Sequence, residues 1–305
     1  MRFRSVLAAA LLSSALALNA CGERGDGGRP VTAVATTPHV ADIVRNVGGG
    51  RVEVGTLVDG QAEPHDYEPR PSDAEALARA DLIVRSGGEI DSWLGDLLDS
   101  SGADAETLTL ADTVRSPRKD DPHWWQDPLN VIAATKAVRD ALVQADPAGR
   151  PGYERRARGY IARLRRLDAA VAACMRRVPA AQRKLVTTHD ALGYFADRYG
   201  LDLIGALIPG RSAQAQPSAG ETDALVRQIE RERVRAIFPE SSLNSKLERA
   251  VAEETGARVG RALFTDTLAS PGRRGDTYIE ATEANAEAIA AGLSGGSVRC
   301  AGPAS

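Results

Sequence analysis

One long helical pattern in the middle of the chain constrains the fold more than any other feature. From Tyr153 to Arg177 there is no proline and only one glycine, Gly159, and apolar residues recur at helical spacing while arginines fill the opposite face. A helix of about 25 residues is long for a globular protein. Because this helix lies between two halves that each show an α/β pattern, we expect it to be a rigid connector between them.

Both flanking halves alternate short runs of β-branched and apolar residues with helical patterns. Such alternation is typical of a parallel sheet covered by helices on both faces. We therefore expect an α/β fold of two lobes, each with a mainly parallel four-stranded sheet flanked by helices, joined by one long rigid backbone helix. The expected strands are Val31–Thr36, Arg51–Val58, Asp81–Arg85, Thr107–Leu110, Lys184–Thr188, Leu201–Ile208, Val234–Phe238 and Arg258–Phe264.

These patterns also predict the domain boundaries. The N-terminal lobe is expected over 31–147, the connecting helix over 148–178, the C-terminal lobe over 179–293 and a C-terminal tail over 294–305. With 43% hydrophobic and 26% charged residues the composition is that of a globular protein. The formal charge is -3 and basic residues gather only on helix faces, so nucleic acid is not expected as a partner.

The first 20 residues have the pattern of a signal peptide. Arg2 and Arg4 precede an apolar stretch of 14 residues, Ser5 to Leu18, which is too short to span a bilayer comfortably. The stretch ends in Leu-Asn-Ala-Cys, which resembles a bacterial lipobox, although Asn19 is not the usual small residue. We expect removal of residues 1–20, lipidation of Cys21 and a Gly-rich tether over 21–30. Cleavage nearby with Cys21 as a bystander is the alternative.

Export determines how the other two cysteines are interpreted. With Cys21 lipidated, Cys174 and Cys300 remain as an even pair in an oxidising compartment. A disulfide between them would hold the C-terminal tail against the end of the long helix. Two free thiols are the alternative.

Four side chains follow strands of the expected sheets and have metal-binding chemistry. His65 and His123 come from the first half, and His189 and Asp266 from the second. In open α/β sheets functional loops lie at the carboxyl ends of the strands, so a site built by both lobes would lie between them. Imidazole nitrogen and carboxylate oxygen suit Zn²⁺ and also accept Mn²⁺ or Fe²⁺. From the spacing alone, each histidine could equally be a loop residue or a helix cap.

Five short motifs occur in a fixed order along residues 31–293. Together they resemble the zinc/manganese substrate-binding lipoproteins of bacterial ABC transporters, the TroA and ZnuA type. The resemblance implies two α/β lobes joined by one long backbone helix, with the metal held between them by His65, His123, His189 and Asp266. The motifs are Pro64-His65-Asp66-Tyr67-Glu68-Pro69, Asp121-Pro122-His123-Trp124-Trp125, Thr188-His189-Asp190-Ala191-Leu192-Gly193-Tyr194-Phe195, Phe238-Pro239-Glu240-Ser241-Ser242 and Leu263-Phe264-Thr265-Asp266-Thr267-Leu268.

Several neighbours of these ligands have expected supporting roles. Glu240 is expected to orient a ligand imidazole through its other nitrogen, with a salt bridge between the lobes as the alternative. Trp124 and Trp125 are expected to wall the cleft beside His123, with core packing as the alternative. Asp190 is expected to cap the helix after His189 rather than bind metal.

Three further features bear on the resemblance. His39 is interpreted as a residue at the start of a helix, since the family has no ligand there. The segment 112–121 is short and contains no histidine, so the metal-gathering loop of many zinc-specific members is absent from this sequence. The segment 208–218 stands where members hold a loop beside the cleft, and its role is open.

The function implied is that of a monomeric, membrane-tethered extracytoplasmic receptor. It would capture Zn²⁺ in preference to Mn²⁺ and deliver it to an ABC permease and its ATPase. Three imidazoles with one carboxylate favour zinc, and manganese-binding members often carry Glu in place of the third histidine, His189. A zinc-dependent hydrolase using the same ligands and an adhesin-type lipoprotein with a structural metal are the alternatives.

Overall fold

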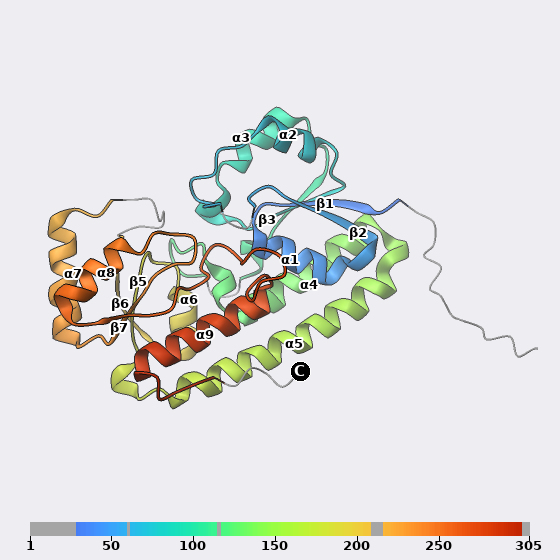
Figure 1. The fold of residues 1–305 in the computed structure, drawn as a ribbon. Coiled ribbons are helices and arrows are strands. Elements are labelled where there is room, and N and C mark those ends of the chain that lie inside the picture. Colours follow the sequence, from blue (N-terminus) through green and yellow to red (C-terminus); the bar gives the residue numbers. More distant parts are fainter. Residues whose placement is uncertain (1–28, 60–61, 115–116, 209–215, 301–305) are drawn as a thin grey trace, which may run out of the picture.

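Two parallel four-stranded sheets form the framework of the computed structural model, which describes residues 29–59, 62–114, 117–208 and 216–300 (Figure 1). The expected signal peptide, the expected lipidation site at Cys21 and most of the expected tether lie outside the described residues. The first sheet has the strand order β2-β1-β3-β4 and every neighbouring pair is parallel. Its strands are β1 (Val31–Ala35), β2 (Val52–Thr56), β3 (Leu82–Arg85) and β4 (Glu106–Thr109).

The second sheet repeats this arrangement with the order β6-β5-β7-β8. The two-lobed α/β expectation is therefore confirmed. The last strand is shorter than predicted, because after Val259 the chain leaves the ladder and returns only as an isolated bridge between Glu240 and Leu263. The strands of this second sheet are β5 (Lys184–Thr187), β6 (Asp202–Ala206), β7 (Ala236–Phe238) and β8 (Arg258–Val259).

Helices cover both sheets. Several begin with a proline in the first turn. Backbone N–H groups in the first turn have no partner within the helix, so the N–H that proline lacks is not needed there. The α-helices are α1 (Pro38–Gly48), α2 (Pro71–Ala78), α3 (Leu94–Ser101), α4 (Pro128–Ala145), α5 (Arg150–Arg177), α6 (Gly193–Tyr199), α7 (Ala219–Glu232), α8 (Lys246–Thr255) and α9 (Tyr278–Ser294). None of the helices that the structure describes is both long and apolar enough to cross a membrane.

The long helix α5 runs beneath both lobes (Figure 1). It contacts α1 and α4 of the N-terminal lobe and α6 and α9 of the C-terminal lobe. One continuous cluster of buried apolar side chains includes Val44 of α1, Leu164 of α5 and Ile289 of α9. The two lobes therefore share a hydrophobic core along this helix, which makes α5 a common base for both.

Polar contacts strengthen the connection between the lobes. Asp42 of α1 accepts hydrogen bonds from the Tyr160 hydroxyl of α5 (3.2 Å) and from the backbone N–H of Tyr278 at the start of α9 (3.3 Å). A disulfide joins Cys174 near the end of α5 to Cys300, which follows α9. These contacts tie α1, α5 and α9 together at the base of the two lobes.

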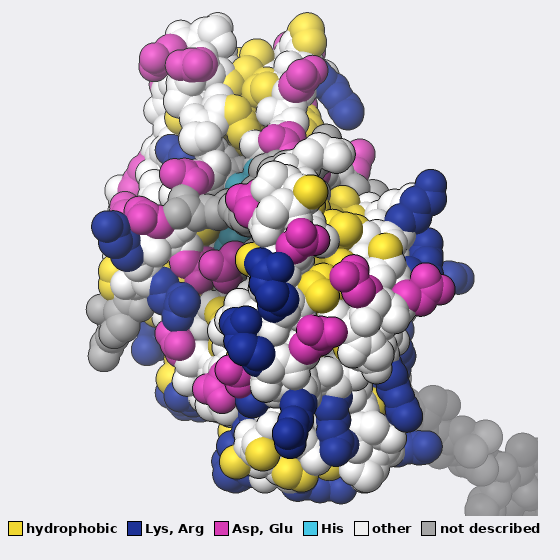
Figure 2. All heavy atoms as spheres, turned by 90° about the vertical axis from the view of Figure 1, so that its left-hand side faces the viewer, with side chains coloured by type: hydrophobic (Ala, Val, Ile, Leu, Met, Phe, Trp, Pro, Cys, Tyr) yellow, Lys and Arg dark blue, Asp and Glu magenta, His cyan; other side chains and the backbone are white. Residues whose placement is uncertain are grey.

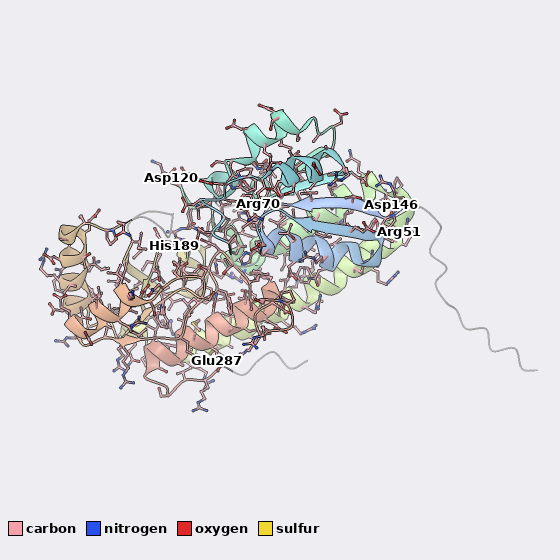
Figure 3. The ribbon with its side chains drawn as sticks, turned by 45° about the horizontal axis from the view of Figure 1, so that its top comes forward. Arg51, Arg70, Asp120, Asp146, His189 and Glu287 are labelled. Carbon is pink, nitrogen blue, oxygen red and sulfur yellow. A yellow bond between two sulfur atoms is a disulfide. The ribbon has the colours of Figure 1, made fainter. Side chains whose placement is uncertain are left out.

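At the far end of the N-terminal lobe, Arg51 and Asp146 form a two-pronged ion pair that is distant from His189 (Figure 3). The N–O distances are 2.9 and 3.0 Å. This pair holds the start of β2 against the end of α4. The opposite ends of the strands, where the sequence places the candidate ligands, remain available for a site between the lobes.

Candidate metal centre

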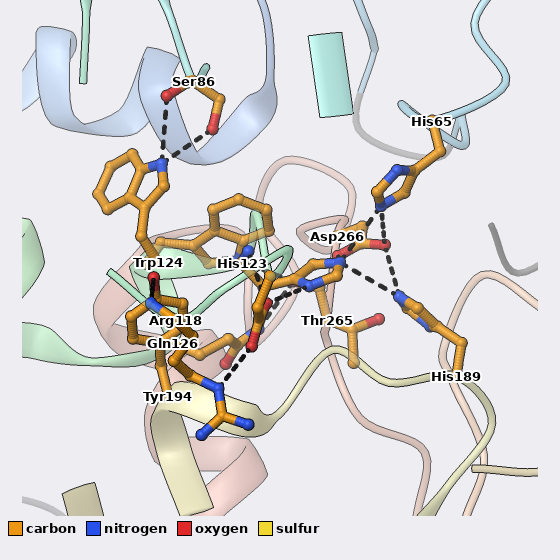
Figure 4. A network of polar contacts seen from close by, with 12 residues as sticks. His65, Ser86, Arg118, His123, Trp124, Gln126, His189, Tyr194, Thr265 and Asp266 are labelled. Atoms are coloured by element: carbon orange, nitrogen blue, oxygen red, sulfur yellow. Dashed lines mark hydrogen bonds and ion pairs between the residues drawn. The ribbon is translucent and has the colours of Figure 1, made fainter. Parts of the chain in front are cut away.

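Four side chains from distant segments meet between the lobes (Figure 4). His65 lies on the loop after β2, His123 directly precedes a short 3₁₀ helix (Trp124–Gln126), His189 follows β5, and Asp266 lies on the loop after β8. One nitrogen or oxygen atom from each side chain falls within 4.8 Å of the other three. Histidine side chains are visible in a recess on one face of the molecule, with acidic side chains around it (Figure 2).

The distances among these atoms match a tetrahedral metal site. The Nε2 atom of His123 lies 3.2 Å from Nε2 of His65 and 3.3 Å from Nε2 of His189. The Asp266 carboxylate oxygens lie 3.2, 3.5 and 3.7 Å from the Nε2 atoms of His189, His123 and His65. Ligands at about 2.0–2.2 Å from a tetrahedral zinc are separated by roughly 3.3–3.6 Å. The side chains are therefore spaced as the donor atoms of such an ion would be.

The carboxylate of Asp266 is buried without a hydrogen-bond donor. Only 2% of its side chain is exposed, and neither oxygen has a hydrogen-bond partner among the described residues. The side chains of His123 and His189 are fully buried, and that of His65 is 5% exposed. A buried carboxylate that accepts no hydrogen bond is unfavourable in a protein interior unless a positive charge lies beside it. A cation at the centre of the three imidazoles would remove this penalty.

The pKa values of these groups follow from burial and mutual attraction. Burial raises the pKa of Asp266, but attraction to the three imidazoles outweighs it and holds this pKa below its ordinary value. Burial lowers the pKa of His65 to about 4, so this ring is neutral near pH 7. Burial also disfavours a charged His189, yet Asp266 and Glu240 raise the pKa of His189 well above its ordinary value.

Two of the imidazoles are oriented by carboxylates on their other nitrogen. Glu240 Oε1 lies 2.5 Å from His189 Nδ1 and also accepts the His189 backbone N–H at 3.1 Å. Asp121 Oδ1 lies 2.9 Å from His123 Nδ1 and accepts the His123 backbone N–H at 3.0 Å. A carboxylate on Nδ1 keeps the proton there and leaves the Nε2 lone pair free for a metal. Glu240 thus occupies the position that the sequence predicts.

Comparison with known proteins defines the family. The family model described as "Zinc-uptake complex component A periplasmic" (ZnuA) matches residues 33–292. The chain belongs to this family. It is 29% identical over 295 residues to the metal ABC transporter substrate-binding lipoprotein SloC of Streptococcus mutans, covering 92% of this chain and 96% of SloC. It is 28% identical to the manganese-binding lipoprotein MntA of Halalkalibacterium halodurans, covering 89% and 90% of the two chains.

A solved member of the family has the same architecture. The periplasmic zinc binding protein TroA from Treponema pallidum superposes with a TM-score of 0.80 at 28% identity, covering 87% of this chain and 99% of TroA. The resemblance inferred from five short motifs is therefore confirmed, as is the two-lobed fold that it implies.

The two tryptophans beside His123 have different surroundings. The Trp125 ring lies edge-on to His123, with centroids 5.4 Å apart, and both tryptophans are 1% exposed. Trp124 instead directs its Nε1 toward Ser86 after β3, 3.1 Å from the hydroxyl oxygen and 3.2 Å from the carbonyl oxygen (Figure 4). Trp125 is therefore the ring that walls the space beside His123, while Trp124 packs into the N-terminal lobe.

His39 and Asp190 take no part in the four-residue cluster. His39 is the second residue of α1, is 3% exposed and stacks on Trp125 with centroids 5.2 Å apart. The predicted cap at Asp190 is wrong, since α6 begins only at Gly193 and its N-terminus has no side-chain cap. A turn closed by the Ala191 N–H on the His189 carbonyl precedes the helix and leaves Asp190 exposed.

Sequence reasoning missed two acids that lie two residues before a ligand. Glu63 accepts the His65 backbone N–H at 3.3 Å, as Asp121 does for His123. Burial, followed by repulsion from Asp266, raises the pKa of Glu63 to about 8, and its buried Oε2 has no hydrogen-bond partner among the residues that the structure describes. The signal was the repeated spacing of acid, any residue and histidine. It is visible in the sequence but too short to be informative without the fold.

Proposed function

We propose that this chain is an extracytoplasmic receptor that binds one divalent transition-metal ion through His65, His123, His189 and Asp266. In this proposal it delivers the ion to an ABC permease and its ATPase. The observation that carries the proposal is the buried Asp266 carboxylate, which accepts no hydrogen bond from the described part of the chain and has three imidazole Nε2 atoms around it at 3.2–3.7 Å. The names of SloC and MntA, substrate-binding or metal-binding lipoproteins, support the transport role.

The geometry favours carriage over catalysis. A hydrolytic zinc site keeps one coordination position open for water, with a general base beside it. Here four side chains supply donor atoms that all lie within 4.8 Å of one another, enough for a four-coordinate site without water. The carboxylates of Asp121 and Glu240 are both engaged with ligand histidines, so neither is available to activate a water. Membership of a substrate-binding family agrees with this interpretation.

Zinc is the favoured metal. Three imidazole nitrogens and one carboxylate oxygen in a tetrahedron suit Zn²⁺, whereas Mn²⁺ prefers more oxygen donors. TroA is named as a zinc-binding protein and MntA as a manganese-binding one, so the family includes both. In our proposal this chain binds zinc, and its set of three imidazoles and one carboxylate supports that preference.

Attachment to the membrane completes the proposal. Cys21 would carry the lipid and residues 21–30 would link it to β1. The names of SloC and MntA, both called lipoproteins, support this location. The proposed receptor acts as a monomer outside the cytoplasmic membrane.

The decisive experiment compares two aspartates that lie near the site. Metal-stripped mature protein, its Asp266→Ala variant and its Asp190→Ala variant are titrated with Zn²⁺ and with Mn²⁺ against a chromophoric chelator. Wild-type protein and Asp190→Ala should bind one zinc ion more tightly than manganese, because Asp190 is exposed and outside the cluster. Asp266→Ala should lose tight binding. Equal affinity in the two variants would refute the ligand assignment.

Circular dichroism of the stripped proteins separates transport from a structural role for the metal. A metal that only supports the fold would leave the stripped wild-type protein unfolded. The shared core along α5 predicts that it stays folded without metal.

A further inference from the structure

Thr265 is hydrogen-bonded to both lobes. It lies directly before Asp266 and is 2% exposed. Its carbonyl oxygen accepts hydrogen bonds from Trp125 Nε1 and Gln126 Nε2, each at 2.9 Å. Both donors belong to the short 3₁₀ helix that begins immediately after His123. A single carbonyl of the C-terminal lobe therefore holds the segment of the N-terminal lobe that carries a ligand.

The side chain of Thr265 is linked to a third proposed ligand, His189, through Glu240. Its hydroxyl donates to Glu240 Oε2 at 2.6 Å, and the other oxygen of Glu240 accepts both the ring and the backbone N–H of His189. Glu240 is buried, with 3% of its surface exposed, and receives these three donors. Each donor that a buried carboxylate receives limits the positions it can adopt. The orientation of His189 therefore depends on the Thr265 hydroxyl.

Neighbouring contacts keep Thr265 itself in place. The backbone of Phe264 is bonded twice to Asn285 of α9, through its N–H at 2.8 Å and its carbonyl at 2.6 Å. On the other side, the Tyr278 hydroxyl donates to the Trp125 carbonyl at 2.7 Å. Helix α9 thus supports both partners of the contact between the lobes.

We propose that Thr265 is the positioning residue that links three ligands into one unit, His123 and His189 through hydrogen bonds and Asp266 through the backbone. Its carbonyl fixes the segment after His123, its backbone leads into Asp266, and its hydroxyl aligns Glu240 behind His189. The fourth ligand, His65, is held by Glu63 of its own loop. This inference rests on the proposed ligand set and adds that the affinity of the site depends on a hydroxyl that touches no metal.

The test compares Thr265→Val, which keeps the shape but removes the hydroxyl, with Thr265→Ser, which keeps the hydroxyl. Zinc affinity is measured in mature protein by chelator competition. Loss of a group that orients a metal ligand typically weakens affinity by about 10–100-fold. We expect that loss in Thr265→Val and near wild-type affinity in Thr265→Ser. Wild-type affinity in Thr265→Val would overturn the proposal, as would equal losses in both variants.

The absorption spectrum of bound Co²⁺ separates positioning from simple loss of packing. A shifted ligand His189 changes the d–d bands, whereas a loosened core lowers thermal stability and leaves them unchanged. We expect shifted bands in Thr265→Val and wild-type bands in Thr265→Ser. Unshifted bands in Thr265→Val would contradict a positioning role.

A second variant tests the contact between the lobes. Gln126→Met preserves side-chain length but removes one of the two donors to the Thr265 carbonyl, and it should release zinc to a chelator faster than wild-type protein. An unchanged dissociation rate would argue that the carbonyl contact has no role in holding the site together. If the Thr265 and Gln126 variants behave like wild-type protein while Asp266→Ala still loses tight zinc binding, the positioning role fails and the proposed function stands. If Asp266→Ala keeps tight binding, the proposed ligand set itself fails.

Discussion

His123 and His189 face each other from opposite lobes with their Nε2 atoms 3.3 Å apart. Each ring has a carboxylate on its Nδ1, Asp121 for His123 and Glu240 for His189, so both Nε2 lone pairs point into the same space. Two lone pairs at this distance repel each other unless a proton or a cation lies between them. The two imidazoles are therefore already oriented for metal binding.

Removing His189 should weaken zinc binding strongly. His189→Ala deletes one of the four donors and leaves Glu240 without its ring partner, so we expect at least about a tenfold loss of affinity, comparable to or larger than the loss of an orienting group. Chelator competition measures the affinity, and circular dichroism should show an unchanged fold. Unchanged affinity would show that the four-ligand assignment is wrong.

Zinc affinity should fall as the pH falls. The raised pKa of His189 favours a second proton on this ring in the metal-free protein, and the metal must displace that proton. Acidification favours the protonated form and so opposes binding, while the lowered pKa of His65, about 4, adds a second competing proton only in stronger acid. Calorimetry in buffers of different ionisation enthalpy should detect about one proton released per zinc ion at neutral pH. No proton release would contradict the assigned protonation of His189.

His39 should destabilise the metal-free protein in mild acid. Burial, partly opposed by Asp266, lowers the pKa of His39 to about 4 from 6.5. Between these values the unfolded chain binds a proton that the folded protein excludes, so stability falls as pH drops through this window and levels off below it. The loss should reach about 2 kcal/mol at pH 5.

Urea unfolding at pH 7.5 and pH 5 of wild-type protein and His39→Gln isolates this effect. The variant has no titrating ring at this position, so the stability difference between the two proteins should shift in favour of the variant at pH 5. A difference that does not change with pH would show that His39 is not buried as a neutral ring.

The disulfide should stabilise the fold without affecting the metal site. Cys174 and Cys300 are separated by 126 residues, and closing so long a loop restricts the unfolded chain. The double variant Cys174→Ser/Cys300→Ser should lose about 2–4 kcal/mol of unfolding free energy. Zinc affinity should stay at the wild-type value, because neither cysteine contacts the cluster. A fall in affinity would indicate that the tail influences the site.

Metal binding should leave the overall dimensions of the protein unchanged. Helix α5 packs against helices of both lobes, and Asp42 links α1 to α5 and α9. A wide hinge motion would break this shared core. Small-angle scattering of metal-free and zinc-loaded protein should give the same radius of gyration, and a clear decrease on loading would contradict a rigid connector.

Much of this architecture was predictable because its signals are local. The amphipathic run from Tyr153 to Arg177 predicts α5, which the structure extends by one turn to Arg150. The four candidate ligands follow strands, where parallel sheets place their functional loops, but it was the resemblance to family motifs that distinguished them from ordinary loop residues.

What could not be predicted depends on contacts between distant segments. The Thr265 carbonyl meets Trp125 and Gln126 from the other lobe only after both lobes have docked on α5, and no pattern near Thr265 indicates this. The helix after His189 starts later than predicted, because an intervening turn replaces the expected cap at Asp190. Such features are decided by tertiary packing rather than by local preference.

The disulfide after α9 has a topological consequence. It closes residues 174–300 into a covalent ring that contains His189 and Asp266, whereas His65 and His123 lie on the open part of the chain. A single proteolytic cut in an exposed turn of the C-terminal lobe would therefore leave the protein in one covalent piece, with both of that lobe's ligands still attached. A cut between His65 and His123 would instead split the site across two separable fragments.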